Sequence, residues 1–269
     1  AGYCAHMTVG HRFDAARYLE RIGYAGPLEP TYDVLHALQV AHMIHVPFEN
    51  LDVYHRRGVE VGVDHSFHKI VERRRGGWCF EVNGGFAALL SAVGFDVDLL
   101  SCRTYEPDSG GLSDPFDHLA LLVGVGGQRY LTDVGWGDNP LRPLPAEPGD
   151  YEASPRPARI ETTPTAIRLI ELVERVDGEI VWELQYEADR TPRKLDEFAD
   201  RSTYLQTEPG LIWTERPLVT RATSPAGGRV SLHRDRLRTR HDDQTIVDEE
   251  IAPDAWAAAL SAHFGIDQP

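Results

Sequence analysis

Residues 75–83 read Arg-Gly-Gly-Trp-Cys-Phe-Glu-Val-Asn, which places Cys79 between a glycine pair and a helical pattern. Apolar residues then follow at helical spacing and stop at Gly94: Phe86, Leu89, Leu90 and Val93. This spacing predicts a helix that begins near Cys79, with the sulfur at the positive end of the helix dipole. A reactive cysteine and a buried structural cysteine both fit such a position.

The composition is that of an ordinary globular protein, with 269 residues, 42% of them hydrophobic and 26% charged. The net charge of -15 argues against nucleic acid and anionic membranes as partners. We expect a cytoplasmic protein, because no long apolar segment and no signal peptide are visible. The three cysteines give no disulfide framework. Residues 1–6, with Cys4, read as a vector-derived leader before Met7, and Cys102 reads as a core residue.

Helical periodicity dominates the part of the chain before residue 95. It predicts helices over residues 13–22, from Thr31 to Pro47, and from Asp64 to the arginines at 73–75, in addition to the helix near Cys79. We interpret the three arginines as the solvated end of a helix. Residues 8–94 are therefore expected to form one helical unit.

Extended patterns and turn signals follow. Strands are expected over residues 96–105, 118–125 and 128–136, with a hairpin turn at Gly126-Gly127, and a second hairpin turns at Asp177-Gly178. Seven prolines between residues 140 and 165 predict a long irregular connection. This middle part is typical of an antiparallel sheet or a small barrel.

The signals are weaker after residue 195. They indicate a helical turn over residues 195–198, strands over 218–223 and 228–232, and a last helix from Pro253 to Gly265. Five arginines between Arg229 and Arg240 are interpreted as one solvated strand face.

The first hairpin brings a histidine and an aspartate together. If Gly126-Gly127 is the turn, facing residues have numbers that sum to 253, so His118 lies diagonal to Asp133 on the same face. Diagonal neighbours in a sheet are close enough for an imidazole and a carboxylate to form a hydrogen bond. An imidazole oriented by a carboxylate is the partner that a nucleophilic thiol requires. The hairpin alone does not place this pair beside Cys79.

Several stretches resemble the arylamine N-acetyltransferase family. They are Arg75–Asn83, the turn Val-Pro-Phe-Glu-Asn-Leu-Asp at residues 46–52, Asp-His-Leu at 117–119, and Leu-Thr-Asp-Val-Gly-Trp-Gly at 131–137. The resemblance covers residues 12–144 in order. It implies an α+β fold with a papain-like cysteine-enzyme arrangement: a helical bundle over residues 8–94, an antiparallel β-barrel over 95–194 and an α/β lid over 195–269.

The resemblance also implies a chemistry. It implies a catalytic triad of Cys79, His118 and Asp133, acetyl-CoA as acyl donor, an acetyl-cysteine intermediate, and arylamines or arylhydrazines as acceptors, as in xenobiotic metabolism. The backbone N–H of Cys79 is expected to bind the oxyanion. Five aromatic residues are candidate walls of an apolar acceptor site, with plain core packing as the alternative for each: Phe48, Trp78, Phe80, Phe116 and Trp136. The sequence identifies neither the coenzyme-binding residues nor the oligomeric state.

Other functions remain open on the sequence. A cysteine hydrolase or a transglutaminase-like enzyme also uses cysteine, histidine and aspartate in this order, and a non-catalytic binding module is a third possibility. We expect no metal site, because the histidine pairs His42/His45 and His65/His68 have no evident third ligand. Glu81 and Asn83 fit a structural role and an active-site role equally well, and Arg73–Arg75 have the phosphates of coenzyme A as an alternative ligand.

Overall fold

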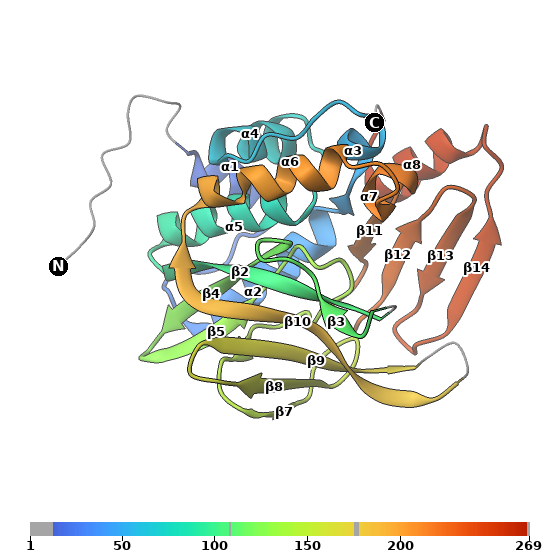
Figure 1. Cartoon of the computed structure of the whole chain (residues 1–269). Coiled ribbons are helices and arrows are strands. Elements are labelled where there is room, and N and C mark those ends of the chain that lie inside the picture. Colours follow the sequence, from blue (N-terminus) through green and yellow to red (C-terminus); the bar gives the residue numbers. More distant parts are fainter. Residues whose placement is uncertain (1–12, 108, 175–177, 268–269) are drawn as a thin grey trace.

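The computed structural model describes residues 13–107, 109–174 and 178–267. Helices gather above a curled sheet, and a second sheet stands beside them (Figure 1). The helices are α1 (Ala15–Arg21), α2 (Tyr32–His45), α3 (Leu51–Tyr54), α4 (Val63–Phe67), the π-helical turn η1 (His68–Glu72), α5 (Cys79–Val93), the 3₁₀ turn η2 (Leu195–Phe198), α6 (Ala199–Thr207), α7 (Ile212–Glu215) and α8 (Trp256–Phe264). Within the described ranges, no helix has the length and apolarity needed to cross a bilayer.

The strands form two separate antiparallel sheets. They are β1 (Phe48–Glu49), β2 (Asp96–Glu106), β3 (Gly111–Leu112), β4 (His118–Val125), β5 (Gln128–Thr132), β6 (Leu144–Pro145), β7 (Gly149–Tyr151), β8 (Ala158–Thr162), β9 (Ala166–Glu174), β10 (Ile180–Arg193), β11 (Val219–Ala222), β12 (Arg229–Leu232), β13 (Arg236–Arg240) and β14 (Ile246–Glu250).

The larger sheet curls into a nearly closed barrel (Figure 1). Its strand order is β6-β5-β4-β2-β10-β9-β8-β7, and β3 adds to β2. The smaller sheet has the order β1-β11-β12-β13-β14, and α8 packs on β11 and β12. The expected α+β class, with N-terminal helices and an antiparallel barrel, is confirmed. The division at residues 94/95 and 194/195 stays a prediction. Strand β1 lies in the N-terminal part of the chain, yet it pairs with β11 of the C-terminal part.

The helix signals were accurate where caps were clear. Thr31 caps α2 through its side chain, α5 begins at Cys79, and Gly94 ends α5 with a positive φ of 109°. The prediction that Asp64 caps the third helix was wrong, because Gly62 is the N-cap of α4 and Asp64 lies within its first turn. Pro253 as the start of the last helix was early, since α8 begins at Trp256.

The strand predictions failed mainly in the proline-rich segment. Residues 140–165 contain β6, β7 and β8, so the predicted irregular connection was wrong. Four of the seven prolines stand at or beside the ends of these short strands, where a missing N–H costs no ladder hydrogen bond: Pro143, Pro145, Pro148 and Pro157. Strand β5 ends at Thr132 and not at Trp136. The leader with Cys4, residues 8–12 and Asp177 of the second predicted turn lie outside the described residues.

Arg229 is buried, which contradicts the expected solvated strand face. Its Nε lies 2.8 Å from Asp138 Oδ1, and Arg240 and Arg156 bind the same carboxylate. Burial alone would raise the pKa of Asp138, but the hydrogen bond from Arg240 and the three positive charges hold it well below its ordinary value. Asp138 follows the barrel strand β5, so these ion pairs fasten the smaller sheet to the barrel.

A second ion network, which is buried, surrounds the start of α5. Lys69 Nζ lies 2.9 Å from Glu81 Oε1 and 2.8 Å from Asp52 Oδ2, and all three side chains are almost completely buried. Arg75 binds Glu49 at 2.7 Å. Arg75 is therefore an internal ion-pair partner, and its expected place at a solvated helix end was wrong, whereas Arg73 and Arg74 are exposed.

This network joins segments that are distant in the sequence. Glu49 also accepts a hydrogen bond from the backbone N–H of Leu51, and Glu81 accepts one from that of Trp78. Three carboxylates and two cations therefore hold β1, α3, η1 and the first turn of α5 together. Removing one partner would leave an uncompensated charge away from water.

We predict that Lys69→Met lowers the free energy of unfolding by about 3–5 kcal/mol, because it removes the cation that the buried Glu49, Asp52 and Glu81 share. Urea unfolding followed by circular dichroism measures the change. Lys194→Met is the matched control, since Lys194 is exposed and should change stability by no more than about 0.5 kcal/mol. Equal stability of the two variants would contradict a structural role for the network.

Asp52 makes part of this stability dependent on pH. Burial alone would raise the pKa of Asp52, but the charge and hydrogen bond of Lys69, with Arg75 and Arg57, lower it from 3.8 to about 2. A depressed carboxyl pKa stabilises the fold above its unfolded value and loses that contribution as the pH falls through its folded value.

The difference in unfolding free energy between the wild type and Asp52→Asn should therefore be constant above about pH 4 and shrink toward pH 2. Urea titrations at a series of pH values measure it. The exposed Glu29→Gln serves as the control and should show no comparable change. A difference between wild type and Asp52→Asn that stays constant to pH 2 would rule Asp52 out as the source.

Candidate active site

Cys79 is the first residue of α5 and is buried at 8% exposure. Trp78 precedes it in an extended conformation, and its N–H donates to Glu81 Oε2 at 3.1 Å, so Glu81 fixes the turn that presents the cysteine. Two glycines permit close packing around this turn. A Cβ on Gly76 would lie 1.9 Å from the carbonyl oxygen of Pro47, and one on Gly135 would lie 2.8 Å from Cys79 Cα.

His118 and Asp133 form the hydrogen bond that the hairpin predicted. The register pairs Leu121 with Thr132 and Val125 with Gln128, so facing numbers sum to 253 as expected. His118 is the first residue of β4 and lies in the part of that strand that does not pair with β5. Asp133 is the first residue after β5. His118 Nε2 lies 2.8 Å from Asp133 Oδ2, and both side chains are buried.

Asn83 connects the helix to this pair. It lies one turn after Cys79 and is completely buried. Its Nδ2 donates to the carbonyl oxygen of Leu119 at 2.6 Å and to Asp133 Oδ1 at 2.8 Å, and its Oδ1 accepts from the N–H of Val134 at 2.9 Å. The two roles left open for Asn83 therefore coincide: a structural contact between helix and barrel also orients Asp133.

Asp133 is held on both carboxylate oxygens. Oδ1 accepts from Asn83 and from the N–H of Gly135 at 2.7 Å, while Oδ2 faces His118. The carbonyl oxygen of Asp133 accepts from Asn139 Nδ2 at 2.7 Å. This carboxylate has little freedom to rotate, so it fixes the His118 ring.

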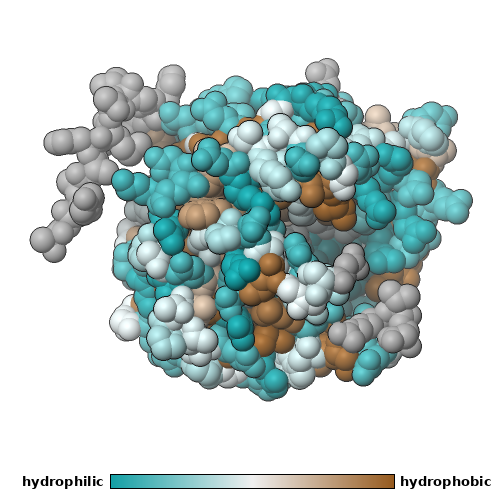
Figure 2. Space-filling view, in the orientation of Figure 1, coloured by the Kyte–Doolittle hydropathy of each residue, from teal (hydrophilic) through white to brown (hydrophobic). Residues whose placement is uncertain are grey.

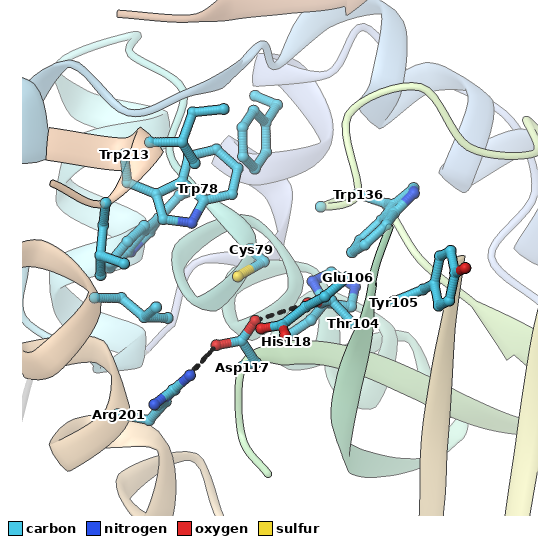
Figure 3. Close-up of a pocket in the computed structure, with 15 residues that line it drawn as sticks. Trp78, Cys79, Thr104, Tyr105, Glu106, Asp117, His118, Trp136, Arg201 and Trp213 are labelled. Atoms are coloured by element: carbon cyan, nitrogen blue, oxygen red, sulfur yellow. Dashed lines mark hydrogen bonds and ion pairs between the residues drawn. The ribbon is translucent and has the colours of Figure 1, made fainter. Parts of the chain in front are cut away.

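Cys79 and His118 face one cavity of about 350 Å³ (Figure 3). Figure 2 shows the face of the molecule hollowed between the upper helices and the sheet below, with hydrophobic residues above the hollow. Of the five aromatic residues considered as walls, Phe48, Trp78 and Trp136 line the cavity. Phe80 and Phe116 instead pack with Phe198, which favours the core alternative for these two.

The C-terminal part supplies cavity walls that the sequence did not reveal. They come from α6, α7 and the segment between them: Arg201, Leu205, Leu211, Ile212 and Trp213. The barrel and the segments beside it supply the remaining walls: Thr104, Tyr105, Glu106, Asp117 and Gly135. One signal for α6 was available, because the buried residues Phe198, Ser202 and Leu205 have helical spacing.

The surroundings of Cys79 oppose an isolated thiolate. Burial raises the pKa of the Cys79 thiol, and backbone hydrogen bonds from Leu119 and Phe80 lower it only in part. Burial therefore outweighs the backbone hydrogen bonds at the start of α5 in setting the pKa of this thiol.

The remaining candidates have structural partners. Cys102 is fully buried inside the barrel, as expected. His42 is also fully buried, where burial lowers its pKa to about 3, and it lies 3.0 Å from the Tyr18 hydroxyl. His65 and His68 face Glu81 and Glu72, respectively. In the described part of the chain, no group of three or more histidine, cysteine, aspartate or glutamate side chains is placed to hold a metal ion.

Comparison with known proteins identifies the family. The model of the N-acetyltransferase family matches residues 31–268. Arylamine N-acetyltransferase of Mycolicibacterium smegmatis is 33% identical over 94% of this chain and 92% of its own length, and arylamine N-acetyltransferase 2 of Macaca mulatta is 31% identical over 75% of each. The structure of Mycobacterium marinum arylamine N-acetyltransferase in complex with CoA superposes with a TM-score of 0.85 at 28% identity, covering 94% of this chain and 93% of that one.

These matches span the helices, the barrel and the C-terminal sheet, and they agree with the resemblance carried by the cysteine stretch. The chain belongs to the arylamine N-acetyltransferase family and is an acyltransferase.

Proposed function

We propose that the protein transfers an acetyl group from acetyl-CoA to an arylamine or arylhydrazine in a ping-pong reaction through acetyl-Cys79. The observation that carries this proposal is the cavity that contains both Cys79 and His118, with Asp133 bound behind the imidazole. The relative from Mycobacterium marinum, whose structure holds CoA, supports a coenzyme A thioester as the donor.

In the first half-reaction, the Cys79 thiol gives its proton to His118 as the sulfur attacks the thioester carbonyl. Because Nε2 of His118 binds Asp133, Nδ1 is the nitrogen left for the thiol. Asp133 stabilises the imidazolium that forms. The backbone N–H of Cys79, at the start of α5, is assigned to the carbonyl oxygen as negative charge develops there. The bond to coenzyme A then breaks, and its sulfur takes the proton from His118.

In the second half-reaction, the acceptor nitrogen attacks acetyl-Cys79. His118 removes a proton from that nitrogen, the bond to Cys79 breaks, and the cysteine sulfur takes the proton back. Water would hydrolyse the intermediate, so the site must favour an aromatic amine over water. The indoles of Trp78, Trp136 and Trp213 supply apolar walls suited to an aromatic acceptor (Figure 3).

The family assignment favours this reaction over a cysteine hydrolase or a transglutaminase-like enzyme. A binding module without catalysis is also disfavoured, because Asp133 is a buried carboxylate whose three hydrogen-bond contacts orient one histidine toward a cysteine-lined cavity.

Incubation with acetyl-CoA alone should add one acetyl group, detected by intact mass spectrometry and assigned to the Cys79 peptide. Cys79→Ala should remain unmodified, whereas Cys102→Ser should be acetylated like the wild type, since Cys102 lies in the barrel core. Release of coenzyme A without a stable acetyl-protein, in the absence of an amine, would favour the hydrolase alternative.

Asp133→Asn should lower kcat by about three to four orders of magnitude with little change in stability, because an amide stabilises the wrong imidazole tautomer. Steady-state transfer to an arylamine measures the rate, and thermal unfolding tests the fold. Asp150→Asn is the control, since Asp150 pairs with Arg159 on the barrel surface and should leave kcat unchanged. Full activity in Asp133→Asn would remove Asp133 from the mechanism.

A further inference from the structure

An ion pair closes one side of the cavity. Arg201 of α6 donates from Nε and Nη2 to Asp117 Oδ1 at 2.9 and 2.7 Å, and from Nη1 to Asp114 Oδ2 at 3.1 Å. Asp117 Oδ2 accepts from the Thr104 hydroxyl at 2.9 Å. Figure 3 shows the Arg201–Asp117 pair below Cys79, with Asp117 adjoining His118.

This pair is mostly shielded from water. The side chains of Arg201 and Asp117 are 18% and 13% exposed, in contrast to Asp114 at 78%. Both members of the pair line the cavity with Cys79. Electrostatic interactions across such a cavity are stronger than at an open surface.

The charge balance near the sulfur depends on Arg201. Among the described residues that line the cavity, Glu106 and Asp117 are acidic and Arg201 is the one arginine or lysine. In the described ranges, seven titratable or charged groups face Cys79 or share its cavity. They are Cys102, Tyr105 and Glu106 of β2, Asp117 just before β4, His118 at the start of β4, Asp133 after β5, and Arg201 of α6. Without Arg201, the negative charge of Asp117 would act on Cys79 undiminished.

We propose that Arg201 is a positioning residue that neutralises Asp117 and thereby allows Cys79 to transfer its proton to His118. The proposal rests on Cys79 as the nucleophile of the proposed function. The role of Asp117 agrees with its contribution to the raised pKa of the Cys79 thiol, which burial dominates. Because Arg201 belongs to α6, the charge that neutralises Asp117 comes from the C-terminal part of the chain.

The test is the pH dependence of Cys79 alkylation by iodoacetamide, followed on the Cys79 peptide by mass spectrometry. Arg201→Gln should move the midpoint upward by about half to one pH unit, and Asp117→Asn should move it downward by a similar amount. The double variant Asp117→Asn/Arg201→Gln removes both charges and should return close to the wild-type midpoint.

Two further variants test whether Arg201 acts through its charge or only by holding α6 against the barrel. Arg201→Lys keeps the positive charge, so it should keep the wild-type midpoint although the paired geometry is lost. Arg168→Gln removes a half-exposed arginine that pairs with Glu187 and should leave the midpoint unchanged. If Arg201 serves only to fasten α6, then Arg201→Gln, Asp117→Asn and the double variant should all shift the same way, and that result would overturn the proposal.

Alkylation requires neither acetyl-CoA nor an acceptor, so the two proposals fail separately. Opposite midpoint shifts in a protein that forms no acetyl-cysteine would overturn the proposed function and support the role of Arg201. If acetyl-cysteine forms and the alkylation midpoints of Arg201→Gln and the wild type are identical, the proposed function is supported and the role of Arg201 is overturned.

Discussion

The hydrogen bonds of Asn83 fix the relation between helix α5 and the barrel, and the geometry of the site depends on them. One amide contacts Leu119, Asp133 and Val134, which belong to two different barrel segments. Cys79 lies one helical turn away on the same helix, so its distance from His118 follows from where Asn83 is held. A polar contact of this kind specifies a single arrangement, because any shift of the helix would leave the buried amide without partners and would remove one hydrogen bond from the buried carboxylate.

Charge is distributed unevenly in this acidic protein. Two networks combine acids with bases: a buried one around Lys69 and a partly exposed one around Asp138. Each network joins segments that are far apart in the sequence. A buried ion pair contributes little net stability, but it penalises every arrangement in which its partners separate. Both networks therefore favour the correct relative placement of the helices and sheets that surround the site.

The sequence predicted the contact between His118 and Asp133 and the helix start at Cys79 better than their surroundings, for physical reasons. The register of the first hairpin follows from a short glycine turn, so local information placed His118 beside Asp133. The helix start at Cys79 is likewise a local feature. In contrast, the sequence around Arg75 and Arg229 is typical of surface residues. Their burial depends on the carboxylates of Glu49 and Asp138, which are distant in the sequence, and no local pattern predicts such partners. Helix α6 presents mostly polar residues, and β14 is exposed throughout, so neither has a strong hydrophobic period.

Because α6 and α7 supply walls of the cavity, the cavity is completed only after the C-terminal part of the chain has folded. Ribosomal synthesis proceeds from the N-terminus, and Cys79, His118 and Asp133 emerge well before Leu211 and Trp213. Strand β1 likewise gains its neighbouring strand only after β11 has been synthesised. The nascent chain thus carries Cys79 without the apolar enclosure, which forms only when the last third of the polypeptide folds onto the rest.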